Sequence, residues 1–330
     1  MAGDMIDFQK FAISFDARDK NRVFDYWNEI FSNQKWTEGK FTALFEEKWS
    51  KWNDLPSVAM SSWAGGALAC LEYFKLAGKT VLCPTNTFMA TPLSVVKANA
   101  NILFADSNRE DLCLSYDALV SAARRHEIAA VWLVHIGGHI AFDTPRIAEF
   151  CRSNNIILLE DCAHAHGASW KGQKPGNWGD AGVYSFYATK SITTGEGGML
   201  VSKNNDLIEF AKAYRNYGKF DHKVQGLNYR MSEFTAAMGA VQTDRLEQIT
   251  AWKNDMVRKY LDNRFEKRVR FPEGMTSGFY KYIVFEPVEK STGKVYDQLC
   301  HNLLGHEGSF PNAEWISRNH WCVPLYYHPE

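Results

Sequence analysis

Two segments in the middle of the chain carry most of the side chains that could do chemistry. Residues 160–167 read Glu-Asp-Cys-Ala-His-Ala-His-Gly and contain Asp161 and His164, and residues 185–190 read Ser-Phe-Tyr-Ala-Thr-Lys and end at Lys190. A lysine can hold an aldehyde cofactor as a Schiff base, and a carboxylate can keep the ring nitrogen of pyridoxal phosphate protonated, so that the ring accepts electrons. Lys190 and Asp161 can fill these roles. Taken alone, however, Lys190 is typical of a surface lysine and Asp161 of a loop carboxylate.

The same cofactor needs groups that bind its phosphate and a flat side chain against its ring. Gly65 and Gly66, at the start of a predicted helix over residues 64–76, offer backbone amides without side-chain obstruction. Ser185 offers a hydroxyl group. Phe88 lies just beyond a predicted strand, where it could stack on the ring or could equally belong to the core.

These residues must be positioned by a sheet. From Ala64 to about Tyr217, helical patterns alternate with short apolar runs that lack polar alternation, which indicates strands covered by helices on both faces. The predicted fold is α/β, with a mostly parallel central sheet whose strands lie at Thr80–Cys83, Ile102–Ala105, Val131–Val134, Ile156–Leu159, Val183–Phe186 and Met199–Val201. Ligand sites in such sheets lie beyond the carboxyl ends of the strands, where Asp161 and Lys190 are expected.

We expect a large α/β domain over residues 1–240 and a small α+β domain over residues 241–330. Ser232 can cap a long amphipathic helix that runs towards Phe265 and connects the two domains. Residues 1–40 are expected to pack on the small domain or on a partner subunit. The small domain is predicted to contain strands at Tyr280–Phe285 and Cys322–Tyr326 and a helix near Val295–Leu304.

The composition argues against several classes of protein. Lys and Arg total 37 against 38 Asp and Glu, and no basic run is present, so no nucleic-acid partner is expected. The seven cysteines never form a C-x-x-C pair, which is typical of reduced thiols. The segment MAGDMIDFQKF does not have the pattern of a signal peptide, and the most apolar window, 128–142, is too short for a membrane span. We therefore expect a cytoplasmic protein without a membrane partner.

The ordered set of motifs resembles the DegT/DnrJ/StrS family of pyridoxal-phosphate-dependent nucleotide-sugar aminotransferases, which have the aspartate-aminotransferase-like fold type I. The resemblance covers residues 36–46, 62–68, 84–91, 160–168, 179–190, 195–198, 215–218 and 228–233. It implies an amino transfer from glutamate or glutamine to a keto sugar, in particular a nucleotide-linked keto-deoxysugar. It also implies a homodimer with shared active sites.

The resemblance also implies roles for single residues. Lys190 would carry the cofactor as a Schiff base, Asp161 would bind the ring nitrogen, and Phe88 would stack on the ring. The phosphate would be held by Gly65, Gly66 and Ser185, together with Asn228 from the other subunit. Plausible residues of the substrate wall are Trp36, Lys40, Arg230, His306, Trp315 and Tyr326.

Three features depart from the family pattern. Ala64-Gly65-Gly66 replaces the usual Gly-Thr-Ala or Gly-Thr-Ser, which removes a hydroxyl from the phosphate site. His164 replaces a glutamine that bonds the ring hydroxyl of the cofactor in many members, and a histidine can donate from one nitrogen but can also titrate near neutral pH. The C-terminal domain is short, so the substrate-recognition loops are expected to be abbreviated or differently built.

Three other interpretations stay open at this point. A pyridoxamine-dependent sugar dehydratase of the same fold would have its lysine replaced, typically by histidine, and Lys190 argues against it. A cofactor-binding regulator without turnover would keep the fold. A metal hydrolase could use a set of side chains that follow adjacent strands, although their spacing matches no compact zinc motif and we predict no metal: His135, His139, Asp161, His164 and His166.

Overall fold

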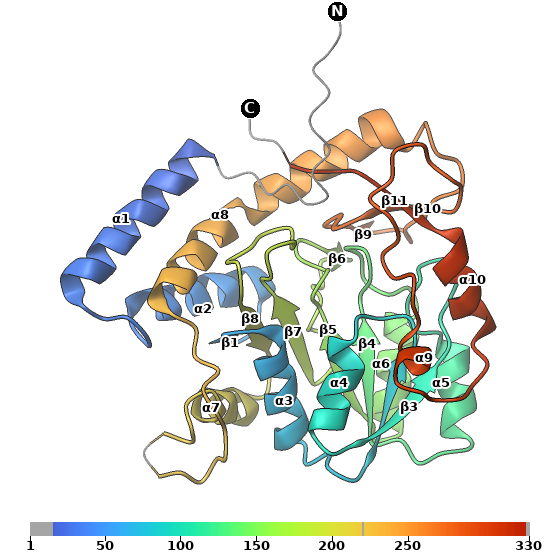
Figure 1. Cartoon of the computed structure of the whole chain (residues 1–330), viewed down its shortest axis with the longest axis horizontal. Coiled ribbons are helices and arrows are strands. Elements are labelled where there is room, and N and C mark those ends of the chain that lie inside the picture. The colour runs from blue at the N-terminus through green and yellow to red at the C-terminus, as the bar shows by residue number, and fades with distance from the viewer. Residues whose placement is uncertain (1–15, 220, 328–330) are drawn as a thin grey trace, which may run out of the picture.

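A seven-stranded sheet forms the centre of the molecule, with the strand order β1-β8-β7-β5-β4-β2-β3 (Figure 1). The computed structural model describes residues 16–219 and 221–327. The strands are β1 Ser57–Met60, β2 Thr80–Pro84, β3 Asn101–Ala105, β4 Ala130–Val134, β5 Ile157–Asp161, β7 Ala181–Ser185 and β8 Gly198–Val201. Strand β8 is antiparallel to β1 and β7, whereas the other neighbouring pairs are parallel. The predicted mostly parallel α/β sheet is confirmed, and β1 is an additional strand that the sequence did not reveal.

Helices cover both faces of the sheet, which explains why its strands are apolar throughout. The helices are α2 Lys40–Asn53, α3 Trp63–Tyr73, α4 Ala90–Lys97, α5 Tyr116–Ala123, α6 Thr144–Ser153 and α7 Asn205–Tyr214. Side chains alternate along each strand: Val81 and Cys83 of β2 pack in the core with α3 and α7, whereas Leu82 between them packs with α5 and α6.

The long predicted helix is present as α8, Glu233–Met256, and continues into a π-helical turn at Val257–Leu261. Ser232 is its N-cap, because the Ser232 hydroxyl accepts the amide of Thr235 at 3.2 Å. Helix α1, Ala17–Asn33, and helix α2 both pack on α8 (Figure 1). The N-terminal segment was expected to pack on the small domain or on a partner subunit; its residues 1–15 lie outside the described part, and the domain boundary at residue 240 stays a prediction.

Up to residue 327, the C-terminal region has two short helices and contributes strands to two small sheets. Strand β10, Tyr282–Val284, pairs with β11, Trp321–Val323, and β6, Ser169–Trp170, pairs with β9, Met275–Thr276. Of the helix expected near Val295–Leu304, only α9, Cys300–Leu303, forms. The preceding residues run along a cavity instead, and the amide of Cys300 donates to the carbonyl of Thr85 at 2.9 Å.

Helix α10, Pro311–Asn319, was not predicted. Its first turn is stabilised from a distant part of the chain, because the carboxylate of Asp106 accepts the amides of Asn312 at 3.1 Å and Ala313 at 2.8 Å. Within residues 16–219 and 221–327, no helix is both long and apolar enough to cross a bilayer.

Candidate active site

A cavity of about 510 Å³ lies beyond the carboxyl ends of β4, β5 and β7, and it contains both Lys190 and Asp161. Five predicted site residues line it: Phe88, Asp161, His164, Ser185 and Lys190. Other walls come from Trp63 at the start of α3, from Tyr187 and from the C-terminal residues 280–298. The position of this cavity matches the position of ligand sites in parallel α/β sheets.

Asp161 is the last residue of β5 and is only 5% exposed. The hydroxyl of Thr91 donates to its Oδ2 at 2.8 Å, and the amide of Ala163 donates to its Oδ1 at 3.0 Å. Burial raises the pKa of this carboxyl group, while these two hydrogen bonds and the charge of Lys190 act in the opposite direction. The carboxylate is thus held in one orientation at the floor of the cavity.

Lys190 is 9% exposed, and its Nζ lies 4.9 Å from the ring centroid of Tyr280. Burial lowers the pKa of this lysine to about 8, against the opposing effect of Asp161, and the charge of Lys281 lowers it further. The amide of Lys190 donates to the carbonyl of Tyr187 at 2.9 Å, which fixes the turn after β7. A buried lysine with a lowered pKa is the form of the side chain that can act as nucleophile and base.

His164 is buried beside the same cavity. The amide of Gly137 donates to its Nδ1 at 3.5 Å, so the ring proton belongs on Nε2. Burial, followed by the charges of Lys190 and Lys281, holds the pKa of His164 well below its ordinary value. The expectation that His164 could titrate near neutral pH is therefore wrong, and the ring is a neutral donor.

The predicted phosphate site has a different arrangement from the one expected. The amide of Gly65 is not free, because it donates to the hydroxyl of Ser62 at 3.3 Å, and neither Gly65 nor Gly66 lines the cavity. Their role in phosphate binding stays a prediction. Ser185 does line the cavity, and its oxygen accepts the amide of Tyr187 at 3.3 Å, which leaves its hydroxyl proton for a ligand.

The remaining predicted residues lie outside the cavity of a single chain. Asn228 is exposed, and its side-chain oxygen accepts the amide of Arg230 at 3.2 Å. Lys40 pairs with Glu29 at 2.8 Å, and Trp36 is 51% exposed. The ring of His306 packs on Phe104, that of Trp315 packs on Phe285, and Tyr326 follows β11. None of these residues is among those that line the cavity.

Several cavity residues were missed by the sequence reasoning. Tyr280, Lys281, Lys294 and Tyr296 all follow the last recognised motif, and Trp63 lies beside the predicted phosphate site. The sequence contained one signal for these residues, the pair Gly137-Gly138 shortly after a predicted strand. Paired glycines at such a place permit another part of the backbone to approach closely.

The histidines of the metal-hydrolase interpretation do not meet at one centre. His135 is bonded to the buried carboxylate of Glu160 at 2.8 Å, and that carboxylate also accepts three backbone amides. His166 packs among the rings of Trp49, Tyr184 and Phe186. Both histidines therefore lie in the interior of the fold, apart from each other.

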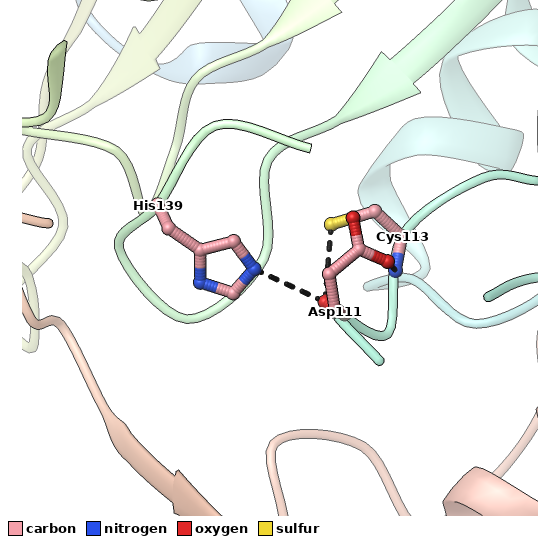
Figure 2. Close-up of side chains that lie close together, drawn as sticks. All are labelled: Asp111, Cys113 and His139. Carbon is pink, nitrogen blue, oxygen red and sulfur yellow. Dashed lines mark hydrogen bonds between the residues drawn. The ribbon is translucent and has the colours of Figure 1, made fainter. Parts of the chain in front are cut away.

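His139 belongs to a separate cluster with Asp111 and Cys113 (Figure 2). Its Nε2 is bonded to the backbone carbonyl of Asp111 at 3.1 Å. The two carboxylate oxygens of Asp111 accept the amides of Cys113 at 3.0 Å and Phe142 at 2.5 Å. These contacts join two loops.

The sequence matches the DegT/DnrJ/EryC1/StrS aminotransferase family over residues 17–274. The chain belongs to this family. A relative named GDP-perosamine synthase from Escherichia coli O157:H7 is 30% identical over 72% of this chain and 67% of its own length. A second relative, described as an L-glutamine:3-amino-2,3-dideoxy-scyllo-inosose aminotransferase of Micromonospora echinospora, is 34% identical over 54% of this chain and 44% of its length.

Solved structures of DegT-family proteins have the same fold. An aminotransferase from Brucella abortus superposes with a TM-score of 0.87 at 20% identity and covers 94% of this chain and 91% of its own. PseC of Helicobacter pylori, an aminotransferase of pseudoaminic acid biosynthesis, has a TM-score of 0.82 at 22% identity and covers 96% and 93%. DegT-family aminotransferases depend on pyridoxal phosphate, and DesV of S. venezuelae was solved as a ketimine complex, so the predicted cofactor is confirmed at the level of the family.

Proposed function

We propose that this DegT-family protein transfers an amino group from glutamate or glutamine to the keto group of a sugar or cyclitol. One observation carries the proposal: the buried side chains of Lys190 and Asp161 line the same cavity. The lowering of the pKa of Lys190 to about 8 agrees with it. The side chains fit pyridoxal phosphate, because a nucleophilic amine, a buried carboxylate, a hydroxyl and the 63% exposed ring of Phe88 all line the same space. When bound, the cofactor supplies an electron sink for the carbon that gains or loses the amino group.

The chain's own residues have distinct tasks in this proposal. Lys190 holds the cofactor and, once released, moves a proton, a step that typically contributes about 10²–10⁴-fold in rate. Asp161 keeps the ring nitrogen protonated. His164 donates its Nε2 proton to the ring hydroxyl, in place of the glutamine of other members. Ser185 contributes to the phosphate site.

The acceptor is proposed from the activities for which the relatives are named. These include a GDP-perosamine synthase and a scyllo-inosose aminotransferase, so a nucleotide-linked keto sugar and a cyclitol are both represented. The aligned part of this chain covers 67% of the length of the first relative and 44% of the length of the second, so the acceptor has to be found by assay. Retention of Lys190 favours transamination over dehydration.

A homodimer with shared active sites is part of the proposal. Asn228, Arg230 and Trp36 lie outside the cavity of their own chain. This is the arrangement expected if such residues complete the cavity of a second copy. The molecular mass in solution, measured by light scattering, tests this element separately from the chemistry.

The absorbance spectrum of the purified protein tests the function most directly. A visible band that shifts when glutamate or glutamine is added would support both the cofactor and the first half-reaction. Lys190→Ala should retain some cofactor and lose the shift. A colourless protein that gains no band with added pyridoxal phosphate would contradict the assignment of Lys190, as would normal turnover by Lys190→Ala.

A further inference from the structure

The backbone around Tyr280 is held by the loop after β4. The carbonyl of Gly138 accepts the amide of Gly278 at 2.7 Å, and the carbonyl of Gly137 accepts the amide of Lys281 at 2.8 Å. These two bonds lie on either side of Tyr280 in the sequence, and they place this residue of the C-terminal region in the wall of the cavity.

The approach of the two segments depends on a glycine. Gly138 has a φ of +110°, which L side chains rarely adopt. A Cβ atom on Gly138 would lie 2.4 Å from the amide nitrogen of Tyr280. The close contact between the loop and Tyr280 therefore requires glycine at position 138.

Helix α8 holds the same segment with two of its side chains. The Nζ of Lys253 donates to the carbonyl of Phe279 at 3.0 Å, and the side-chain amide of Asn254 donates to the carbonyl of Ser277 at 2.8 Å. The backbone that carries Tyr280 is thus fixed before any ligand binds, which reduces the entropy that binding would otherwise cost.

Two contacts join the turn that carries Lys190 to this segment. The hydroxyl groups of Thr189 and Tyr280 form a hydrogen bond of 3.0 Å. Lys253, which bonds the segment, also donates to the hydroxyl of Ser191 at 3.3 Å. Thr189 and Ser191 are the two neighbours of Lys190 in the sequence, so the turn is anchored on both sides of the lysine.

The ring of Tyr280 also contacts the amino group of the lysine. The Nζ of Lys190 lies 4.9 Å from the ring centroid of Tyr280, and Lys190 is only 9% exposed. The face of an aromatic ring attracts an ammonium group at this distance, and the attraction is stronger where water is excluded. The flexible four-carbon stem of a lysine could otherwise place its amino group in several positions. The contact with Tyr280 therefore restricts the amino group to one part of the cavity.

We propose that Tyr280 is a positioning residue for Lys190: its ring holds the amino group, and its hydroxyl group fixes the turn through Thr189. The inference rests on the proposed function, in which Lys190 holds the cofactor, and it gives the C-terminal region a part in that chemistry. Correct placement of a reacting group contributes strongly to the rate of a reaction. Loss of Tyr280 should therefore slow the reaction of Lys190 and leave the binding of its reaction partner unchanged.

The capture of pyridoxal phosphate by the apoprotein tests the proposal. In this reaction the amine nitrogen of Lys190 adds to the aldehyde carbon, a C=N bond forms and water leaves. Stopped-flow absorbance at a series of cofactor concentrations separates the limiting rate from the concentration that gives half of it. Tyr280→Leu removes both the ring and the hydroxyl group. It should lower the limiting rate by about tenfold or more and leave the half-saturating concentration unchanged.

Two conservative variants isolate the hydroxyl contact. Tyr280→Phe and Thr189→Val each remove the bond between Thr189 and Tyr280, and each should lower the limiting rate about fivefold, as expected for one neutral hydrogen bond. Because both changes remove the same bond, the double variant should be no slower than either single variant. Thr292→Val removes a hydroxyl group from the same cavity but not from the turn of Lys190, and it should leave the limiting rate unchanged.

Three outcomes would overturn the proposal: capture by Tyr280→Leu at the wild-type rate, a double variant whose loss is the product of the two single losses, or a loss in Thr292→Val equal to that in Thr189→Val. If urea denaturation shows that Tyr280→Leu does not fold, the comparison of Tyr280→Phe, Thr189→Val and their double variant decides the question.

Failure of the proposed function has a different signature. If the wild type captures no pyridoxal phosphate, the assignment of Lys190 fails and the role of Tyr280 fails with it. If the capture rates follow the expected order but glutamate and glutamine leave the absorbance spectrum of the wild type unchanged, Tyr280 positions Lys190 and the proposed amino transfer is wrong.

Discussion

The imidazole ring of His164 stacks on the phenol ring of Tyr280, with 4.1 Å between their centroids and 28° between their planes. Tyr296 lies nearly parallel to the same imidazole, at 5.9 Å and 18°. Together with the amide of Gly137 on Nδ1, these contacts fix both the plane and the tautomer of His164. A histidine held in this way can replace a glutamine as a neutral hydrogen-bond donor.

This geometry predicts that His164 does not change its protonation near neutral pH and so does not alter the absorbance of the bound cofactor. Because burial keeps the pKa of His164 well below its ordinary value, the absorbance spectrum of the holoenzyme should show no transition near pH 6.5. His164→Gln should behave like the wild type, since it keeps a donor. His164→Ala should weaken cofactor binding by about tenfold. A transition near pH 6.5 that disappears in His164→Gln would contradict the prediction.

The lowered pKa of Lys190 predicts the pH dependence of cofactor capture. Only the neutral amine attacks an aldehyde, so the rate at which the apoprotein binds pyridoxal phosphate should rise with pH to a midpoint near 8, the value to which burial lowers this pKa. Stopped-flow absorbance measures this rate.

Two charge variants should move that midpoint in opposite directions. Asp161 favours the charged form of Lys190, so Asp161→Asn should lower the midpoint, whereas Lys281 disfavours it, so Lys281→Met should raise the midpoint. A midpoint near the ordinary lysine value of 10.5 in the wild type would show that the amine is not desolvated in solution.

The fold of the α/β sheet could be predicted from sequence because its strands are buried on both faces. Runs such as Ile156–Leu159 have no polar alternation, and each predicted run corresponds to a strand in the structure. Strand β1, Ser57–Met60, was missed because four residues between two helices carry too little pattern. Lys190 and Asp161 were recognisable because Asp161 ends strand β5 and Lys190 lies in the turn that follows β7.

The C-terminal part of the site was beyond sequence reasoning because tertiary contacts decide its structure. The helix expected near Val295–Leu304 is reduced to four residues at Cys300–Leu303, since the preceding residues lie along the cavity and Tyr296 contacts His164. Helix α10 starts where Asp106, about two hundred residues away in the sequence, accepts its first amides. Local propensity contains no information on such distant partners.

The contacts of Glu233, which does not line the cavity, predict that its replacement strongly reduces the stability of the fold. Its carboxylate is buried and accepts the amides of Gly39 at 2.9 Å, Phe41 at 2.7 Å and Thr42 at 3.0 Å at the start of α2. Glu233→Gln should lower the free energy of unfolding by about 2–3 kcal/mol, because it removes the negative charge from a helix N-terminus and turns an acceptor into a donor. Urea denaturation measures the change. The exposed Glu247 on the same helix is the control, and Glu247→Gln should have little effect.

His320 binds the backbone of Val295 in the cavity wall, and this bond is expected to be lost at low pH. It is buried, its Nδ1 is bonded to the carbonyl of Ile316 at 2.6 Å, and its Nε2 accepts the amide of Val295 at 2.8 Å. A protonated ring could not accept that amide. Burial accordingly lowers the pKa of His320 to about 4, with a further lowering by Lys294 and an opposing effect of Asp297. Val295 is the neighbour of Tyr296, so this bond anchors the segment that packs against His164.

The sign of the pH effect follows from these values. Between about pH 6.5 and 4 the unfolded chain binds a proton at His320 and the folded chain does not, so this residue makes stability fall as the pH is lowered through that range. Between pH 7 and pH 5 the contribution amounts to about 2 kcal/mol.

His320→Gln can keep both hydrogen bonds without titrating, so the loss of stability between pH 7 and pH 5, measured by urea denaturation, should be smaller than in the wild type by that amount. Because the comparison uses the difference between two pH values, other titrating groups affect both proteins equally. Identical pH dependence in the two proteins would mean that folding does not lower the proton affinity of His320, so that the bond from Val295 does not hold the ring neutral.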